Sequence, residues 1–171
     1  MNFNDIPSGK DVPNDIYAIV EISSNSDPVK YEIKKNYNAI FVDRFIPSAM
    51  FYPCNYGYIN KTKCSDGDPI DILVKTPYPV LPGSVIQCRP VGVLKMYDES
   101  GKDFKIISVP SKSSTNLYNK IQDIDDISSV FLEKIYHFFQ HYKDLEKNKT
   151  VRLDGWGDID EAKSIILSSL I

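Results

Sequence analysis

Three aspartates lie within six residues of one another in the segment Asp66–Asp71, which reads Asp-Gly-Asp-Pro-Ile-Asp. Its glycine and proline favour a turn, and the apolar run Ile70–Lys75 favours a strand. Carboxylates held this close repel one another unless cations lie between them, and hard cations such as Mg²⁺ prefer oxygen ligands. An EF-hand calcium loop does not fit, because its closing glutamate position falls on Pro77. The segment indicates either a metal-dependent reaction or a solvated turn, and by itself it leaves both open.

A second acidic segment, Tyr97–Lys105, has the pattern of a hairpin with turn residues at Glu99–Gly101. Asp98 and Asp103 flank this turn and can face the same side. A charged hairpin tip has the same pattern, so the segment alone does not establish a function. If the two acidic segments meet at one end of a barrel, however, they form a site for several metal ions.

Cationic and phenolic side chains complement these carboxylates. Lys30 and Glu32 share one face of a predicted strand, so an ion pair between them is the simplest interpretation. Arg44 ends another predicted strand, and Lys143 follows a tyrosine. Cations beside carboxylate-bound metals would favour binding of a polyanion such as a phosphate compound. Arginine binds phosphate through two parallel hydrogen bonds, and lysine acts as a point charge. The tyrosines of Phe51–Tyr58 are either phenol donors for the same site or part of the core.

Short strands and two helices must position these residues. Apolar and polar residues alternate in short runs separated by turn residues, which is typical of a small barrel or sandwich. The predicted strands are Ile16–Ser23, Val29–Lys34, Ala39–Arg44, Ile70–Lys75, Val85–Arg89, Val91–Tyr97 and Phe104–Val109. Near the C-terminus a helical period places on one face Phe131, Ile135, Phe138, Tyr142 and Leu145. Asp126 or Ser128 could cap that helix, and Asp158 with Glu161 opens a second one. The pattern predicts a mainly β protein of the α+β class, a barrel with two helices packed on it.

Composition limits the classes of protein that remain. The chain is 42% hydrophobic and 25% charged, as in ordinary globular proteins, and 171 residues favour one domain spanning 1–171. A formal net charge of −3 argues against a general nucleic-acid partner. The N-terminus has no signal-peptide pattern and no apolar run is long enough to span a bilayer, so we expect no membrane partner. Cys54, Cys64 and Cys88 form no C-x-x-C pair, as expected for reduced thiols in the cytoplasm.

Taken together, these segments resemble the soluble family I inorganic pyrophosphatases of bacterial type. The resemblance covers nearly the whole chain through the segments Ile6–Lys10, Asp15–Tyr17, Lys30–Glu32, Val42–Phe45, Tyr52–Tyr58, Asp66–Asp71, Arg89–Met96 and His141–Glu146. It implies a five-stranded barrel of OB type with two helices, and Mg²⁺-dependent hydrolysis of pyrophosphate to two orthophosphates. It further implies several Mg²⁺ ions in each site, with Mn²⁺ or Zn²⁺ as possible substitutes, and a homohexamer built as a dimer of trimers.

The resemblance also assigns residue roles. Asp68 matches the residue that accepts a proton from the attacking water. The implied metal ligands are Asp66, Asp71, Asp103, Asp98 and Glu32. The implied phosphate contacts are Lys30, Arg44, Tyr56, Tyr142 and Lys143, and the active-site shell adds Glu21, Tyr52 and Lys105. The sequence departs from the family at Lys102, beside Asp103, where relatives often carry an acidic residue.

Two other functions compete with this interpretation. An OB-type module for single-stranded nucleic acid pairs a basic groove with stacking aromatics, whereas the candidate cavity here is acidic. A two-metal phosphatase for organic phosphate esters would use the same residue types and would differ in its substrate.

Two histidines suggest how the subunits associate. His137 and His141 lie one turn apart on the exposed side of the first helix and resemble a region used between subunits. Because histidine gains a charge in mildly acidic solution, the sequence predicts a hexamer that loosens at acidic pH.

Overall fold

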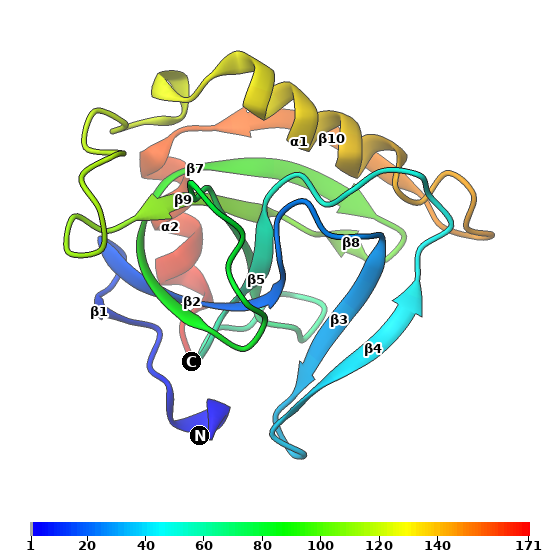
Figure 1. Cartoon of the computed structure of the whole chain (residues 1–171), viewed down its shortest axis with the longest axis horizontal. Coiled ribbons are helices and arrows are strands. Elements are labelled where there is room, and N and C mark those ends of the chain that lie inside the picture. The colour runs from blue at the N-terminus through cyan, green and yellow to red at the C-terminus, as the bar shows by residue number, and fades with distance from the viewer. Residues whose placement is uncertain (1) are drawn as a thin grey trace.

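In the computed structural model, which describes residues 2–171, a closed ring of strands forms the centre of the molecule (Figure 1). The five strands of the ring, in order, are β2 (Asp15–Ile22), β5 (Asn55–Ile59), β6 (Ile70–Val74), β9 (Lys105–Pro110) and β7 (Val85–Asp98), and β7 pairs back with β2. The ring is extended by β1 (Gly9–Asp11), which pairs with β2, and by β8 (Gly101–Lys102) and β10 (Val151–Gly157), which pair with β7. The predicted mainly β architecture is therefore confirmed.

A separate two-stranded arm projects beside the ring. It consists of β3 (Val29–Lys34) and β4 (Ala39–Phe45), whose register places Lys30 opposite Arg44 (Figure 1). Glu21 of β2 anchors the arm, because its carboxylate accepts a 2.7 Å hydrogen bond from the Ile33 N–H. Ile33 also packs with Ile19 and Tyr58 of the ring. The arm thus carries two of the predicted phosphate contacts on adjacent strands.

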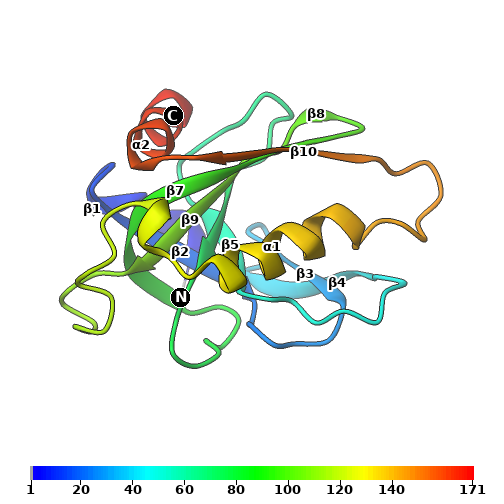
Figure 2. The ribbon, with the colours of Figure 1, turned by 90° about the horizontal axis from the view of Figure 1, so that it is seen from above.

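Two α-helices pack on the outside of the sheet (Figure 2). Helix α1 (Ser129–His141) lies along β10, and α2 (Ile159–Ser169) covers β7. Each buries its apolar face, α1 through Ile135, Phe138 and Phe139 and α2 through Ala162 and Ile166. Two short 3₁₀ helices, η1 (Phe3–Asp5) and η2 (Ile124–Asp126), complete the elements of the described residues. In this part of the chain, no helix is long and apolar enough to cross a membrane.

The helix caps follow the prediction in part. The Asp158 carboxylate accepts a hydrogen bond of 2.9 Å from the Glu161 N–H and starts α2, as predicted. Ser128 occupies the N-cap position of α1, but its side chain makes no capping hydrogen bond. Asp126 instead lies within η2, where Asp123 is the N-cap and the Asp126 carboxylate accepts a hydrogen bond from the Asp123 N–H. Leu145 was wrongly placed on the apolar face, because α1 ends at His141 and Leu145 is 75% exposed.

The strand predictions failed where glycine or proline interrupts the pattern. Strand β5 was missed, although its Gly57 is essential: a Cβ there would lie 1.9 Å from the Ile19 carbonyl oxygen of β2. Strand β10 was also missed. The predicted strands 85–89 and 91–97 are in fact one strand, β7, which runs through Pro90 because the pairing with β9 shifts register between Pro90 and Gly92. A bulge of this kind accommodates a proline that cannot donate a ladder hydrogen bond.

Candidate active site

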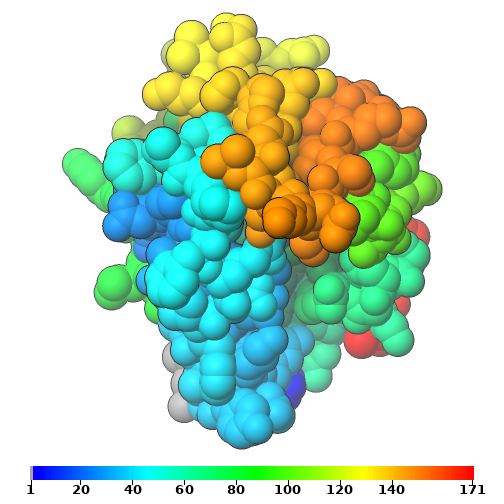
Figure 3. All heavy atoms as spheres, turned by 90° about the vertical axis from the view of Figure 1, so that its right-hand side faces the viewer, coloured from blue at the N-terminus to red at the C-terminus, as the bar shows by residue number. Residues whose placement is uncertain are grey.

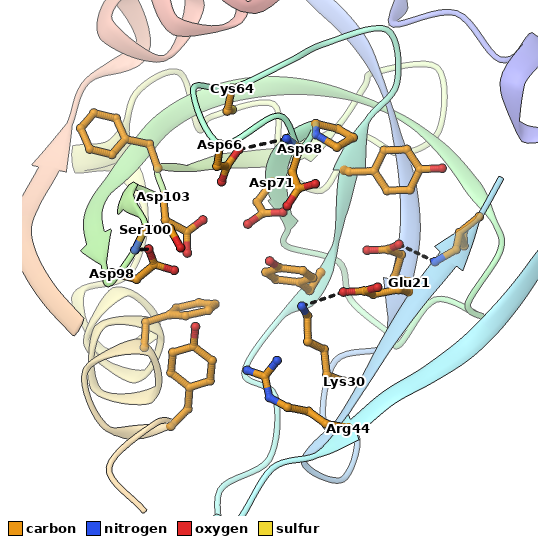
Figure 4. A pocket seen from close by; sticks show the side chains of 18 of the residues that line it. Glu21, Lys30, Arg44, Cys64, Asp66, Asp68, Asp71, Asp98, Ser100 and Asp103 are labelled. Carbon is orange, nitrogen blue, oxygen red and sulfur yellow. Dashed lines mark hydrogen bonds and ion pairs between the residues drawn. The ribbon is translucent and has the colours of Figure 1, made fainter. Parts of the chain in front are cut away.

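A cavity of about 720 Å³ lies between the ring, the arm and the segment that follows α1 (Figure 4). Its carboxylates are those of Glu21, Glu32, Asp66, Asp68, Asp71, Asp98, Glu99 and Asp103. The predicted cations and phenols that line it are Lys30, Arg44, Tyr52, Tyr56, Tyr142 and Lys143. Every predicted site residue except Lys105 therefore lines one cavity. Lys105 contacts three residues that line it, Tyr56, Asp71 and Asp103.

The loop between β5 and β6 holds Asp66 and Asp68 through its main chain. The Cys64 N–H donates to the Asp68 carbonyl at 2.7 Å, and the Gly67 N–H donates to the Cys64 carbonyl at 3.0 Å. The Asp68 N–H donates to Asp66 Oδ1 at 3.0 Å. Gly67 has a φ of 95°, a conformation that glycine adopts without strain. The Asp-Gly-Asp-Pro pattern thus forms a tight turn that directs two carboxylates into the cavity.

Asp71 and Asp103 share the ammonium group of Lys105. The Lys105 Nζ lies 2.7 Å from Asp71 Oδ2 and 3.0 Å from Asp103 Oδ1, and this side chain is 1% exposed. Burial would lower the pKa of Lys105, but Asp103 and Asp71 outweigh it and hold the pKa above its usual value. Burial raises the pKa of Asp71 to about 6; Lys105 opposes this rise and Asp103 adds to it. The cavity floor therefore holds more negative charge than one internal cation offsets.

The hairpin of β7 and β8 delivers the other acidic residues. Asp98 pairs with Gly101 across the hairpin, and its Oδ1 accepts a hydrogen bond of 2.8 Å from the Ser100 N–H. Lys143, which follows α1, reaches Asp98 Oδ2 at 3.3 Å and Glu99 Oε2 at 3.6 Å. The sequence did not single out Glu99 as a site residue, since its partner lies far along the chain. The predicted meeting of the two acidic segments at one cavity is thus what the structure shows.

The arm supplies cations that face the aspartates (Figure 4). Lys30 Nζ lies 2.9 Å from Glu32 Oε1, so the ion pair expected along β3 is present, and Lys34 pairs with Glu32 as well. Arg44 Nε donates to Glu146 Oε1 at 2.7 Å. Lys102, the departure from the family pattern, also lines the cavity and lies 5.8 Å from the Phe104 ring centroid.

The tyrosines at the cavity remain protonated phenols. Burial raises the pKa of Tyr56 well above its usual value, and Asp71 adds to this effect. Burial also raises the pKa of Tyr142, against the opposing effect of Lys105. A protonated phenol donates a hydrogen bond, so both residues can bind an anionic oxygen. These rings also pack on α1: Tyr142 stacks on Phe138 with centroids 5.3 Å apart, and Tyr56 lies 6.3 Å from Phe139.

Glu21 carries the clearest pH dependence of the site. Burial raises its pKa from 4.5 to about 8, partly opposed by the hydrogen bond from Ile33. Between these two values the folded state retains a proton that the unfolded state releases. The contribution of Glu21 to stability is therefore complete below about pH 4.5 and is lost as pH rises through about 8.

We expect Glu21→Gln to flatten this part of the pH dependence, because glutamine can accept the same hydrogen bond from Ile33 and does not ionise. The measurement is urea unfolding of metal-free protein at mildly acidic and at mildly alkaline pH. The unmodified protein should lose more unfolding free energy than the variant across that interval. Equal losses in the two proteins would contradict the assignment.

The donors in the cavity fit a hard divalent cation. Carboxylate oxygens are the ligands that Mg²⁺ prefers, and five aspartates point into one space: Asp66, Asp68, Asp71, Asp98 and Asp103 (Figure 4). Burial is the main cause that raises the pKa of Asp68, and the negative charge of Asp66 adds to it. A bound cation would therefore relieve the repulsion between these two carboxylates. Within residues 2–171, no three potential ligands are already gathered at one point. The site thus offers the right donors, and their side chains would have to move closer together to bind one metal.

Known proteins of similar sequence and structure are named inorganic pyrophosphatase or inorganic phosphatase. The family model described as inorganic pyrophosphatase matches residues 18–170. The inorganic pyrophosphatase of Yersinia pestis is 57% identical over 169 residues, which is 99% of this chain and 97% of that protein. That of Escherichia coli K12 is 55% identical and covers 99% of this chain and 96% of its own length. The crystal structure of an inorganic phosphatase from Anaplasma phagocytophilum superposes with a TM-score of 0.94 at 48% identity, covering 96% of both chains.

A closed sheet that presents clustered carboxylates opposite fixed cations defines a metal-dependent enzyme of phosphate chemistry. Within this class, the sequence similarity over nearly the full chain points to one family. The chain belongs to the inorganic pyrophosphatase family, in its soluble family I bacterial form, and is a hydrolase that converts pyrophosphate to orthophosphate. The nucleic-acid module and the ester phosphatase that the sequence left open are thereby set aside.

Proposed function

We propose that this enzyme hydrolyses pyrophosphate with Mg²⁺ held by Asp66, Asp71 and Asp103, with Asp98 and Glu32 as further ligands. The observation that carries the proposal is the meeting, in one cavity, of carboxylates from two loops with cations from the arm and from the segment after α1. When bound, Mg²⁺ supplies positive charge for the substrate phosphates and lowers the pKa of a water molecule. Mn²⁺ and Zn²⁺ are possible substitutes.

Asp68 is the proposed base that takes a proton from the attacking water. Burial, then the charge of Asp66, raises its pKa above the usual value for an aspartate. A base is more effective as its pKa approaches the working pH. Hydrogen bonds of its main-chain N–H and carbonyl fix the backbone position from which this carboxylate extends into the cavity.

The cationic and phenolic side chains bind the phosphates in this proposal. Lys30, Arg44 and Lys143 neutralise charge, while Tyr56 and Tyr142 donate hydrogen bonds from their phenols. Tyr52, Glu21 and Lys105 support these residues from the surrounding shell. Positioning and electrostatic stabilisation should carry most of the rate acceleration, as in other phosphoryl transfers.

Orthophosphate release tests the proposal. Pyrophosphate, an aryl phosphate monoester and a single-stranded oligonucleotide are compared with and without Mg²⁺. We expect Mg²⁺-dependent release from pyrophosphate, little from the monoester, and no salt-sensitive binding of the oligonucleotide. Preferential cleavage of the monoester would contradict the proposed substrate.

We also propose that the subunits form a hexamer, a dimer of trimers, through the exposed face of α1. On that face the His137 and His141 ring centroids lie 4.8 Å apart, and His141 Nδ1 lies 2.8 Å from Asp144 Oδ2. A second cavity of about 340 Å³ beside them is lined by Ser129, Leu132, Glu133, Tyr136, His137, Gln140 and Trp156. An apolar hollow next to exposed histidines suits a contact that depends on pH.

We expect this hexamer to dissociate into smaller assemblies between neutral and mildly acidic pH. Protonated histidines on facing subunits would repel each other, although Glu133 and Asp144 nearby temper that repulsion. Light scattering coupled to gel filtration measures the mass at each pH. Replacing both His137 and His141 with asparagine should keep the assembly intact in acid, and a single unchanged assembly of the unmodified protein would contradict the prediction.

We further propose that the whole chain, 1–171, forms one pyrophosphatase domain that works in the cytoplasm. Cys54, Cys64 and Cys88 are all free thiols, which agrees with a reducing compartment.

A further inference from the structure

We propose that Glu146 is a positioning residue that orients Arg44 for the substrate and fastens the β3–β4 arm to the segment after α1. This inference rests on the proposed function, in which Arg44 contacts a phosphate. Glu146 does not line the cavity, and it lies 102 residues from Arg44 along the chain. Its role would therefore be exerted through Arg44 and not through the substrate.

The contact between these residues fixes the guanidinium at one edge. Arg44 Nε donates to Glu146 Oε1 at 2.7 Å, and the Glu146 side chain is 12% exposed. On the far edge of the group, Arg44 Nη1 lies 3.1 Å from Asp43 Oδ2. Because the guanidinium is planar, a carboxylate bound at Nε determines the direction of its remaining N–H groups. Loss of Glu146 would leave Arg44 with an exposed aspartate as its charged neighbour.

Hydrogen bonds of the main chain order the segment that carries Glu146. The Glu146 N–H donates to the Lys143 carbonyl at 3.0 Å, and the Asp144 N–H donates to the His141 carbonyl at 3.1 Å. These turns continue directly from the C-terminal end of α1. Tyr142 and Lys143, two of the proposed phosphate contacts, lie within the same turns. Hydrogen bonds of the main chain thus tie Glu146 to the turns that carry two of the five proposed phosphate contacts.

Two further phosphate contacts, Lys30 and Arg44, lie on the arm, which has its own small sheet. Strands β3 and β4 pair with each other and with no strand of the ring in the described residues. Figure 3 shows the segment after α1, in orange, lying against the cyan part of the chain that includes β4 and the residues beyond it. The ion pair of Arg44 and Glu146 therefore joins the two groups of phosphate contacts across the cavity.

The energetics favour an orienting role over a purely stabilising one. Burial would lower the pKa of Arg44, but Glu146 outweighs this effect and holds the pKa above its usual value. The pair is largely buried, with Arg44 28% and Glu146 12% exposed, so the cost of desolvating both charges offsets much of their attraction and the net contribution to folding stability is small. A guanidinium ordered before the substrate arrives loses less freedom on binding, however, and this gain appears in affinity.

The test compares Glu146→Gln and Glu146→Asp with the unmodified enzyme at saturating Mg²⁺. Glutamine keeps the acceptor oxygen for Arg44 Nε but loses the charge. We therefore expect Glu146→Gln to raise KM for pyrophosphate by up to about tenfold, the difference between a charge-assisted and a neutral hydrogen bond, with a much smaller change in kcat. Glu146→Asp keeps the charge but shortens the reach, and its KM should fall between the two. Mg²⁺ affinity measured by calorimetry without substrate should stay unchanged. The matched control is Asp154→Asn, which breaks the exposed ion pair of Arg152 and Asp154 at 3.2 Å and should leave KM unaltered.

A double-mutant cycle with Arg44→Ala separates this inference from the proposed function. If Arg44→Ala raises KM and adding Glu146→Gln raises it no further, Glu146 acts through Arg44. An unchanged KM in Glu146→Gln, or an equal increase with and without Arg44, would overturn the inference while the role of Arg44 stands. An unchanged KM in Arg44→Ala would instead refute the proposed phosphate contact.

Discussion

Replacing Asp68 with asparagine lowers kcat for pyrophosphate by roughly a hundred- to ten-thousandfold, the range that general-base catalysis typically contributes. Asparagine has nearly the same shape as aspartate but cannot accept the proton of the attacking water. The measurement is steady-state orthophosphate release at saturating Mg²⁺ and substrate. Turnover close to that of the unmodified enzyme would exclude Asp68 as the base.

The loop geometry makes this substitution a test of chemistry and not of folding. The turn uses the main-chain N–H and carbonyl of Asp68, in contacts with Asp66 and Cys64, and both groups survive the change to asparagine. Thermal unfolding of the variant should therefore match that of the unmodified protein. Asp125→Asn is a suitable control, because Asp125 is exposed on η2 and does not line the cavity.

Removal of divalent cations should abolish activity and lower stability together. Asp66, Asp71 and Asp103 are the proposed ligands, and burial raises the pKa of Asp71 to about 6 even with Lys105 beside it. Bound Mg²⁺ would relieve this excess of negative charge. A site at a hundredfold excess of metal over its dissociation constant adds about 2.7 kcal/mol to the free energy of unfolding.

The corresponding experiment follows orthophosphate release and thermal unfolding before and after chelation, and again after Mg²⁺ is restored. We expect activity to disappear and return, and the unfolding midpoint to fall and recover with it. Asp71→Asn should weaken both responses to Mg²⁺. Full activity in excess chelator would contradict the proposed cofactor.

The residues that carry the proposed chemistry were easier to predict from the sequence than the contacts that hold them in place. Asp66, Asp68 and Asp71 are adjacent in the chain, so their meeting is a local property of one turn. The presence of Asp98 and Asp103 at the same cavity similarly follows from one hairpin. The contact between Arg44 and Glu146 has no local signal, because it depends on how the arm and α1 are placed around the ring. Folding brings such residues together through the packing of whole elements.

Strand β5 shows the same limit within the fold. Its residues Tyr56, Gly57 and Tyr58 are explained by the neighbours they meet. Gly57 allows close approach of β2, and the two tyrosines share one face of the sheet and line the cavity. In the sequence alone, a glycine at this position suggests a loop, because the neighbouring strand that requires it is not known. By contrast, β3 alternates cleanly and was predicted with its observed bounds, Val29–Lys34.

The ammonium group of Lys105, enclosed between Asp71 and Asp103, bears on how the protein matures in the cell. A chain whose most crowded acids already share an internal counterion can reach its native structure without waiting for a metal. Folding would then precede metal binding, and the metal-free chain would already present Asp71 and Asp103 to an incoming cation.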